Sequence, residues 1–292
     1  MDRSRIRQPL VLASARSTSS EEAAGGASLT SSTPDALWSA PILRVLRPAA
    51  VTCTDLRRGR ELDHCSLSVP HGARLLLVSD PDSTASTLLR VLAGLSRVER
   101  GEIEIAGSTD PTADGWGRRV AYLGPDPGMP SWMTPVEALH LAGDLLDLPH
   151  DEKARRVERA LAWARIPPEA ASRPMRRGGE QMQQRTGLAA ALIGDPQVLL
   201  LDEPLGSLDA RERLRLLRLP GRRRLTVVVA SRFPASQAGL VAHVAYLRQG
   251  RVDLIAPIGA LARAGLPLSH RGVAALAEMQ AAGVPERGAA RA

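Results

Sequence analysis

Residues 198–210 read VLLLDEPLGSLDA, and this stretch decides the fold. Apolar residues run without interruption up to Asp202 and Glu203, and Ser207 and Asp209 follow shortly afterwards. A short apolar run without alternation is typical of a strand that is buried on both faces of a parallel sheet. Acidic side chains at its carboxyl end predict a ligand site at that edge of the sheet, because α/β proteins bind ligands there.

Composition and charge limit the classes of protein that fit this chain. The 292 residues are 44% hydrophobic, which favours one large globular domain with tails. The net charge of +7 comes almost entirely from arginine, and Lys153 is the single lysine. Aromatic residues make up only 2%, so few side chains could stack on bases and we expect no nucleic-acid partner. Cys53 and Cys65 lack metal-ligand spacing and are expected to be free thiols.

The domain organisation follows from changes in composition. We expect a disordered Ser/Ala/Arg-rich tail at 1–47, one domain at 48–257 and an Ala/Gly-rich extension at 258–292. A helical subdomain is expected at about 131–178. No apolar run approaches the ~18 residues that a membrane-spanning helix needs. We therefore expect a cytoplasmic chain that a partner would hold at a membrane.

Periodicity predicts alternating strands and helices along the proposed domain. Strands are expected at 74–78, 101–107, 120–123 and 225–230. Helices are expected at 86–94, 135–147 and 151–164, with 189–193 in a further helix and a short one near 273–280. Thr134 and Glu137 have the spacing of a capping box, and Pro135 takes the first helical position. The segment 79–85 is expected to be a loop.

The order of several motifs resembles that of the ATP-binding subunit of ABC transporters. These motifs are STLLRVLAGL at 86–95, GEIEIAG at 101–107, GGEQMQQR at 178–185 and VLLLDEPLGSLD at 198–209. The resemblance covers about residues 49–258, and exporter-type cassettes are the nearest likeness. It implies an α/β, P-loop NTPase-like (RecA-like) fold with a mostly parallel sheet, an antiparallel β lobe and a helical subdomain.

The resemblance also implies cofactors and partners. In this family two subunits enclose two ATP molecules, each bound with Mg²⁺, and closure drives a membrane permease. A permease and a second cassette are therefore the implied partners, and the implied location is peripheral, at the cytoplasmic membrane.

The slot of the phosphate-binding loop departs from the family pattern. The family places glycine where Ser79, Asp82 and Thr84 stand, and lysine where Ala85 stands. Glycines let backbone N–H groups turn toward phosphates, and the lysine neutralises their charge. Ser86, followed by Thr87, matches the family's Mg²⁺-binding hydroxyl. We expect ATP binding to be weak or lost, and the alternative is an ordinary crossover from strand to helix.

The acidic pair Asp202 and Glu203 keeps the family pattern, whereas three other nucleotide contacts do not. By resemblance Asp202 would hold Mg²⁺ and Glu203 would be the general base. The alternative is that both acids brace a neighbouring loop. Pro125 stands where the family has glutamine, and Arg232 stands in the slot of the histidine that contacts the nucleotide. The aromatic residue expected near Arg58 to stack on adenine is absent.

The signature motif has two possible alignments. One places 176–180 in the slot, with Arg177, Gly178 and Gly179 at its centre and two residues inserted before Arg185; the other, without gaps, places 178–182 there. Both lack the serine that donates to the γ-phosphate, and Arg177 could replace it because arginine pairs well with phosphate. The alternative is a basic turn at the start of a helix. Asp209 matches the D-loop, which lies at the dimer seam in the family.

Three hypotheses follow. The first is a degenerate cassette, a pseudo-ATPase that pairs with an active cassette and a permease; a heterodimer is favoured because a homodimer would contain two impaired sites. The second is an active ATPase with unconventional nucleotide binding. The third is a regulatory or scaffold protein that reuses the fold without transport.

Overall fold

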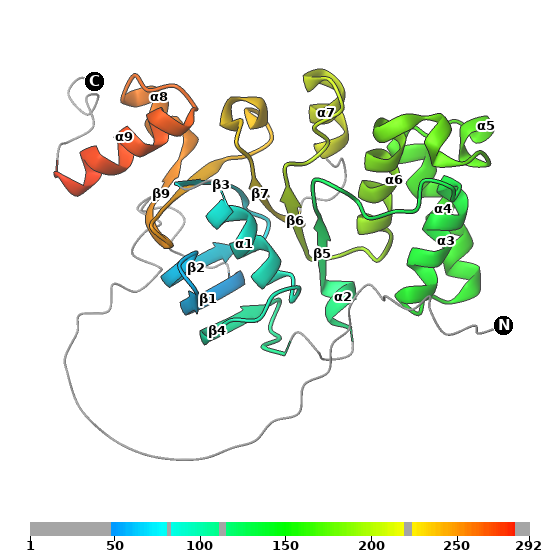
Figure 1. The fold of residues 1–292 in the computed structure, drawn as a ribbon, viewed down its shortest axis with the longest axis horizontal. Coiled ribbons are helices and arrows are strands. Elements are labelled where there is room, and N and C mark those ends of the chain that lie inside the picture. Colours follow the sequence, from blue (N-terminus) through cyan, green and yellow to red (C-terminus); the bar gives the residue numbers. More distant parts are fainter. Residues whose placement is uncertain (1–47, 81–82, 111–114, 219–223, 284–292) are drawn as a thin grey trace, which may run out of the picture.

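Two β-sheets and a group of helices make up the part of the chain that the computed structural model describes, residues 48–80, 83–110, 115–218 and 224–283 (Figure 1). The expected tail at 1–47 lies outside these residues. The larger sheet has six strands in the order β5-β6-β7-β3-β8-β9, all parallel except β9. These strands are β5 (Val120–Leu123), β6 (Val198–Asp202), β7 (Thr226–Ala230), β3 (Arg74–Asp80), β8 (His243–Arg248) and β9 (Arg251–Pro257).

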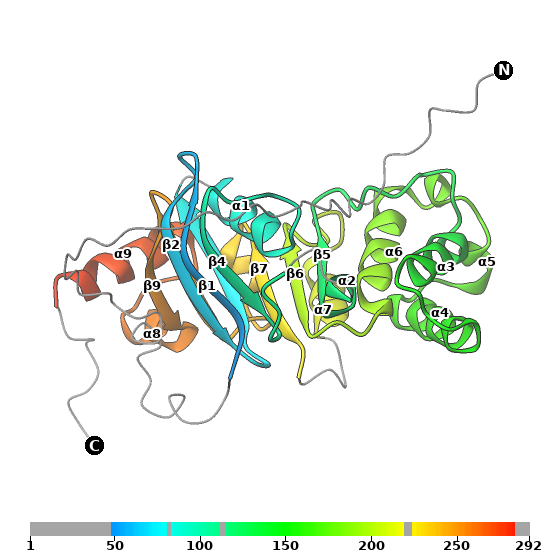
Figure 2. The ribbon, with the colours of Figure 1, turned by 90° about the horizontal axis from the view of Figure 1, so that it is seen from below.

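The smaller sheet is an antiparallel lobe of three strands in the order β2-β1-β4. These are β2 (Leu62–Pro70), β1 (Ala49–Arg58) and β4 (Arg100–Ile105). Figure 2 shows this lobe lying across the larger sheet, with α1 (Ser83–Leu92) beside it. The mixed architecture is the fold class that the sequence predicted.

The helices form two groups in Figure 1. One, drawn in green beyond β5, contains α3 (Pro135–Leu145), α4 (His150–Ala164), α5 (Pro168–Ala171), the 3-10 turn η2 (Met175–Arg177) and α6 (Gly179–Ile193). The other elements lie along the larger sheet: α2 (Trp116–Arg119), α7 (Ala210–Leu217), the 3-10 turn η3 (Pro234–Gln237), α8 (Ile258–Arg263) and α9 (His270–Ala281). Among the described residues, no helix has the length and hydrophobicity to cross a membrane.

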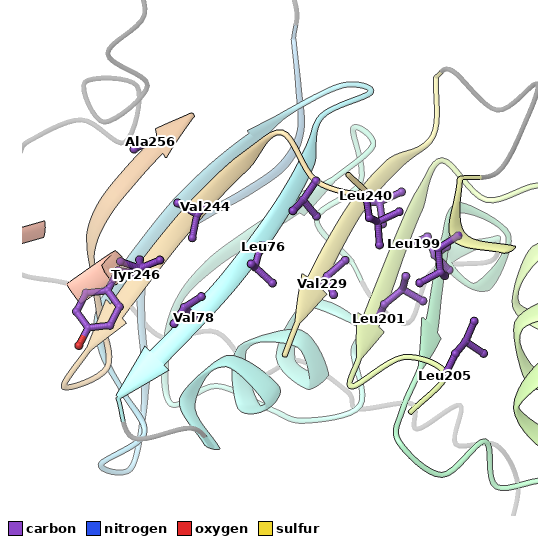
Figure 3. Close-up of a cluster of buried hydrophobic side chains, with 14 of the residues drawn as sticks. Leu76, Val78, Leu199, Leu201, Leu205, Val229, Leu240, Val244, Tyr246 and Ala256 are labelled. Atoms are coloured by element: carbon purple, nitrogen blue, oxygen red, sulfur yellow. The ribbon is translucent and has the colours of Figure 1, made fainter. Parts of the chain in front are cut away.

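The central strands are buried on both faces because alternate side chains enter two different core clusters. In β3, Leu76 and Val78 join the cluster drawn in Figure 3, whereas Leu75 and Leu77 join the cluster that includes α1 and the antiparallel lobe. In β6, Leu199 belongs to the first cluster. This double burial is the physical reason for the uninterrupted apolar runs in the sequence.

Several predicted elements agree with the structure, and others need correction. The capping box is confirmed, since the Thr134 side chain accepts from the Glu137 amide and the Glu137 carboxylate accepts from the Thr134 amide. The expected loop at 79–85 is wrong at both ends, because β3 continues to Asp80 and α1 begins at Ser83.

The helix near the signature slot contains its predicted residues, and the C-terminal region is more helical than predicted. Residues 189–193 lie in a helix as predicted, and this helix, α6, begins at Gly179, whose φ is positive (64°). The residues after 257 form α8 and α9 instead of one short helix. Both helices bury side chains, including Leu261 and Leu276, in the core cluster of Figure 3.

Candidate functional site

The carboxyl ends of three parallel strands meet at one edge of the larger sheet. Leu77 of β3 lies in register with Ala230 of β7, and Asp202 of β6 pairs with the same Ala230. A cavity of about 300 Å³ opens at this edge. Its polar lining residues are Ser79, Ser86, Arg90, Asp202, Glu203, Ser231, Arg232 and His270.

One end of the cavity contains a hydroxyl–carboxylate pair. The Ser86 hydroxyl donates a hydrogen bond to Asp202 Oδ1 (2.7 Å), and the Tyr122 hydroxyl donates to Oδ2 (3.1 Å). Burial raises the pKa of Tyr122, so its phenol stays protonated and continues to donate. Asp202 is only 1% exposed. Hydroxyl and carboxylate oxygens are ligands that Mg²⁺ prefers, so this residue pair fits the metal that the resemblance implied.

Glu203 is turned toward the loop that follows β7. Its carboxylate accepts hydrogen bonds from the Ser231 hydroxyl (3.1 Å) and from the backbone N–H of Arg232, and the Arg232 side chain lies 3.4 Å from Oε1. The Glu203 amide donates to the Ala230 carbonyl (2.9 Å), and its φ is positive (47°). In this arrangement Glu203 braces a neighbouring loop, which is one of the two roles that the sequence left open.

The described residues of the phosphate-loop slot lack the glycines and the lysine of the family pattern. The Ala85 amide donates to the Ser79 hydroxyl (3.1 Å), so this N–H is already used within the protein. Ala85 lines the cavity with a side chain that carries no charge. Thr84 and Thr87 are buried, and Thr84 Oγ1 has no hydrogen-bond partner among the residues that the structure describes. Asp82 lies outside the described residues.

The positive charge that lines this cavity comes from residues outside the phosphate-loop slot. Arg90 lies one helical turn after Ser86, and a hydrogen bond to Tyr122 raises the pKa of its guanidinium. Arg232 is the second cation, and 63% of its side chain is exposed. Both are balanced by the carboxylates of Asp202 and Glu203, so the cavity lining is close to neutral.

The signature and D-loop residues lie outside the cavity lining. Arg177 ends the η2 turn, Gly178 follows it and Gly179 begins α6. Asp209 caps the amino end of α7, where its side chain accepts from the Glu212 amide (2.9 Å).

The D-loop is also joined to α6. The Ser207 hydroxyl and amide both donate to Gln184 Oε1, at 2.9 and 3.2 Å. The structure thus brings Ser79, Ser86, Asp202, Glu203 and Arg232 together and leaves the signature residues on another surface.

Sequence reasoning missed four residues around the cavity. Arg90 could have been found, because it lies four positions after Ser86 and so on the same helix face. Tyr122 lies in the second half of the strand predicted at 120–123, and Ser231 directly follows the strand predicted at 225–230. Both therefore place a hydroxyl near the carboxyl end of a strand. His270 gave no signal, since it is 191 positions from Ser79, the residue that it contacts.

Comparison with known proteins decides the family. A family model described as ABC transporter matches residues 62–206. The aliphatic sulfonates import ATP-binding protein SsuB of Corynebacterium glutamicum is 33% identical over 215 residues, which cover 71% of this chain and 83% of SsuB. The chain belongs to the ABC transporter family. It is an ATP-binding cassette subunit, as its motifs predicted, and cassettes of this family normally bind ATP and Mg²⁺ and work in pairs with a membrane permease.

Further relatives and solved structures agree with this family and fold. The molybdenum import ATP-binding protein ModC of Pseudomonas aeruginosa is 33% identical over 222 residues, covering 72% of this cassette and 60% of ModC. The dimeric structure of MJ0796, a bacterial ABC transporter cassette, superposes with a TM-score of 0.64 at 18% identity, covering 71% of this chain and 98% of that one. SsuB and ModC are import proteins by name, whereas the sequence resemblance pointed to exporter-type cassettes.

Proposed function

We propose that this cassette serves an import complex and that its own nucleotide site is degenerate. It binds Mg-nucleotide weakly and hydrolyses little of it on its own. The observation that carries the proposal is the contrast within one cavity. The Ser86–Asp202 pair suits a metal ion, whereas Ala85 supplies no charge and Glu203 is bound to the loop after β7.

Electrostatics supports the weak-binding part of the proposal. A lysine at position 85 would bring a charge-assisted contact to phosphate, which is stabilising by about 1.5–3 kcal/mol. Asp80, at the exposed end of β3, adds a carboxylate near the start of the loop instead. Glu203 needs a fixed γ-phosphate beside it before it could direct a water molecule, and its present contacts are with Ser231 and Arg232.

The partners in this proposal are a membrane permease and a second cassette, with this chain peripheral at the cytoplasmic face of the membrane. A heterodimer would place the partner's phosphate loop against Arg177, Gly178 and Gly179 of this chain, so one composite site would keep a complete loop. The import direction rests on relatives named for the import of sulfonates and molybdenum. Within this proposal, nucleic acid has no role.

The test is to isolate the complex through a tag on this chain and determine its subunits by native mass spectrometry. We expect a permease and a second, different cassette, and Mg-ATP hydrolysis that the isolated chain lacks. A complex that contains only copies of this chain and still hydrolyses ATP would contradict the proposal.

A second candidate is an active ATPase that binds nucleotide unconventionally. The Ser86–Asp202 pair and the two cavity cations, Arg90 and Arg232, favour it. Steady hydrolysis by the purified chain alone, abolished by Asp202→Ala, would establish this candidate in place of the first.

A further inference from the structure

The C-terminal helix α9 reaches the phosphate-loop slot through its first residue, His270. The imidazole lines the cavity, and its Nε2 lies 3.2 Å from the Ser79 carbonyl oxygen. The Tyr246 ring meets the imidazole edge to face, with centroids 5.8 Å apart and planes at 76°. Both ends of the family-model match, at residues 62 and 206, precede this helix.

The contact with Ser79 defines the proton position on His270. A backbone carbonyl can only accept, so Nε2 carries the hydrogen and donates it. Ser79 also accepts a hydrogen bond from the Ala85 amide through its hydroxyl (3.1 Å). Ser79 therefore connects three elements, because it lies in β3, bonds to the first turn of α1 and is held by α9.

Packing fixes the position of His270. Val273, Leu276 and Ala277 on the same helix are buried in the core cluster that contains Leu76 and Tyr246. The Ser269 hydroxyl accepts from the Gly272 amide (3.1 Å) and caps the helix.

The turn before α9 is tight as well. A Cβ on Gly272 would lie 2.1 Å from the Pro267 carbonyl oxygen, so only glycine fits there. The imidazole is thus presented to Ser79 from a rigid support.

We propose that His270 is a positioning residue of the nucleotide site, which acts by holding the Ser79 carbonyl and hence the first turn of α1. Besides the cavity cations Arg90 and Arg232, a loop without glycines and lysine leaves the backbone N–H groups and hydroxyls at the start of α1 to contact phosphate. The direction of those groups follows from where Ser79 is held. The proposal rests on the proposed function, because it assigns this chain a weak but real nucleotide site.

The experiment compares His270→Phe, which keeps a ring against Tyr246 but has no donor, with His270→Gln, which keeps an N–H group at similar reach. Arg271→Gln is the matched control, because Arg271 is the exposed neighbouring residue and does not line the cavity. The first readout is amide exchange of residues 83–87 in the full chain without nucleotide. The second is the dissociation constant for Mg-ATP by calorimetry, with folding checked by circular dichroism.

We expect His270→Phe to accelerate exchange and weaken Mg-ATP binding, each by about three- to tenfold, as for the loss of one hydrogen bond. His270→Gln should restore both to within about twofold, and Arg271→Gln should change neither. If His270→Phe does not fold, His270→Leu makes the same comparison.

Unchanged exchange in the Phe variant would overturn the proposal, and so would a Gln variant as impaired as Phe, because the ring would then act by packing alone. If exchange shifts as expected while the wild type shows no Mg-ATP binding, His270 still holds the first turn of α1, but the proposed weak nucleotide site fails and the role of His270 in that site fails with it.

Discussion

The cavity has a metal end, at Ser86 and Asp202, and a phosphate end, at Ser79 and Ala85. The two ends require different features of the sequence. At the metal end, Asp202 is buried and accepts from Ser86 and Tyr122, and all three positions are held by regular secondary structure. At the phosphate end, the family pattern needs glycine conformations and a lysine, and this chain has Ser79 and Ala85 among the replacements. A buried carboxylate is retained through its packing and hydrogen bonds, whereas the phosphate-binding pattern is lost when glycines and one lysine are replaced, even though the replacements Ser79, Thr84 and Ala85 are themselves buried.

Because different residues form the two ends, metal binding and phosphate binding can be altered separately within one site. Ser86 and Asp202 bond to each other directly, so a metal ion would replace a contact that is already made. Ala85 offers a bound phosphate only its backbone, and that amide donates to Ser79. The first two of the following changes each alter one end and leave the other in place, and the last two concern Arg232 and Glu203 at the loop after β7.

The largest effect is expected from restoring the phosphate end. Ser79→Gly, Asp82→Gly, Thr84→Gly and Ala85→Lys together should tighten Mg-ATP binding by about 10- to 100-fold, because a lysine–phosphate contact is charge-assisted. Calorimetry measures the gain. The same glycines with Ala85→Met give the matched control without charge. A restored loop that binds no better than the Met control would show that the missing lysine does not limit affinity.

Removing the metal end should have the next largest effect. Asp202→Ala leaves the Ser86 and Tyr122 hydroxyls without their acceptor, which should lower the free energy of unfolding by about 1–3 kcal/mol in urea titrations. ATP affinity should fall about tenfold with Mg²⁺ present and should match that of the wild type when EDTA removes the metal. Equal loss with and without EDTA would mean that Asp202 does not hold the metal.

A smaller effect is expected at Arg232, whose side chain is 63% exposed and pairs with Glu203 at 3.4 Å. Arg232→Ala should weaken Mg-ATP binding by about two- to fivefold at low salt, and the difference should shrink at high salt because exposed charges are screened. Arg232→Lys keeps the charge and should stay near the wild type. A salt-independent loss would point to the fold of the loop instead of the charge.

The smallest effect is expected at Glu203. In the isolated complex, Glu203→Gln should change hydrolysis by less than about twofold, because the carboxylate braces the loop after β7. Arg177→Ala, at the proposed composite site, should reduce hydrolysis several-fold and serves as the comparison. The reverse result would make Glu203 the general base of a working site and reject the assignment of a degenerate cassette.

Much of the fold could be predicted because its signals are local. The apolar run at β6, the capping box at Thr134 and Glu137, and the amphipathic helix α4 each have short-range physical causes that appear in the sequence. The acids of the cavity could be predicted for the same reason, since they follow directly from the end of a buried strand.

The rest depends on contacts between distant segments, which no short pattern encodes. His270 approaches Ser79 only because the core packing of α9 places it there. The orientation of Glu203 toward Ser231 is set by neighbouring strands in the sheet, and its residue type alone was compatible with either role.

The measurement that tests the central claim most directly is calorimetry of Mg-ATP with the purified chain alone. The account predicts a dissociation constant above about 100 μM, that is, a binding free energy weaker than about −5.5 kcal/mol. A dissociation constant of a few micromolar or below would contradict it, because the phosphate end would then hold nucleotide without glycines or lysine.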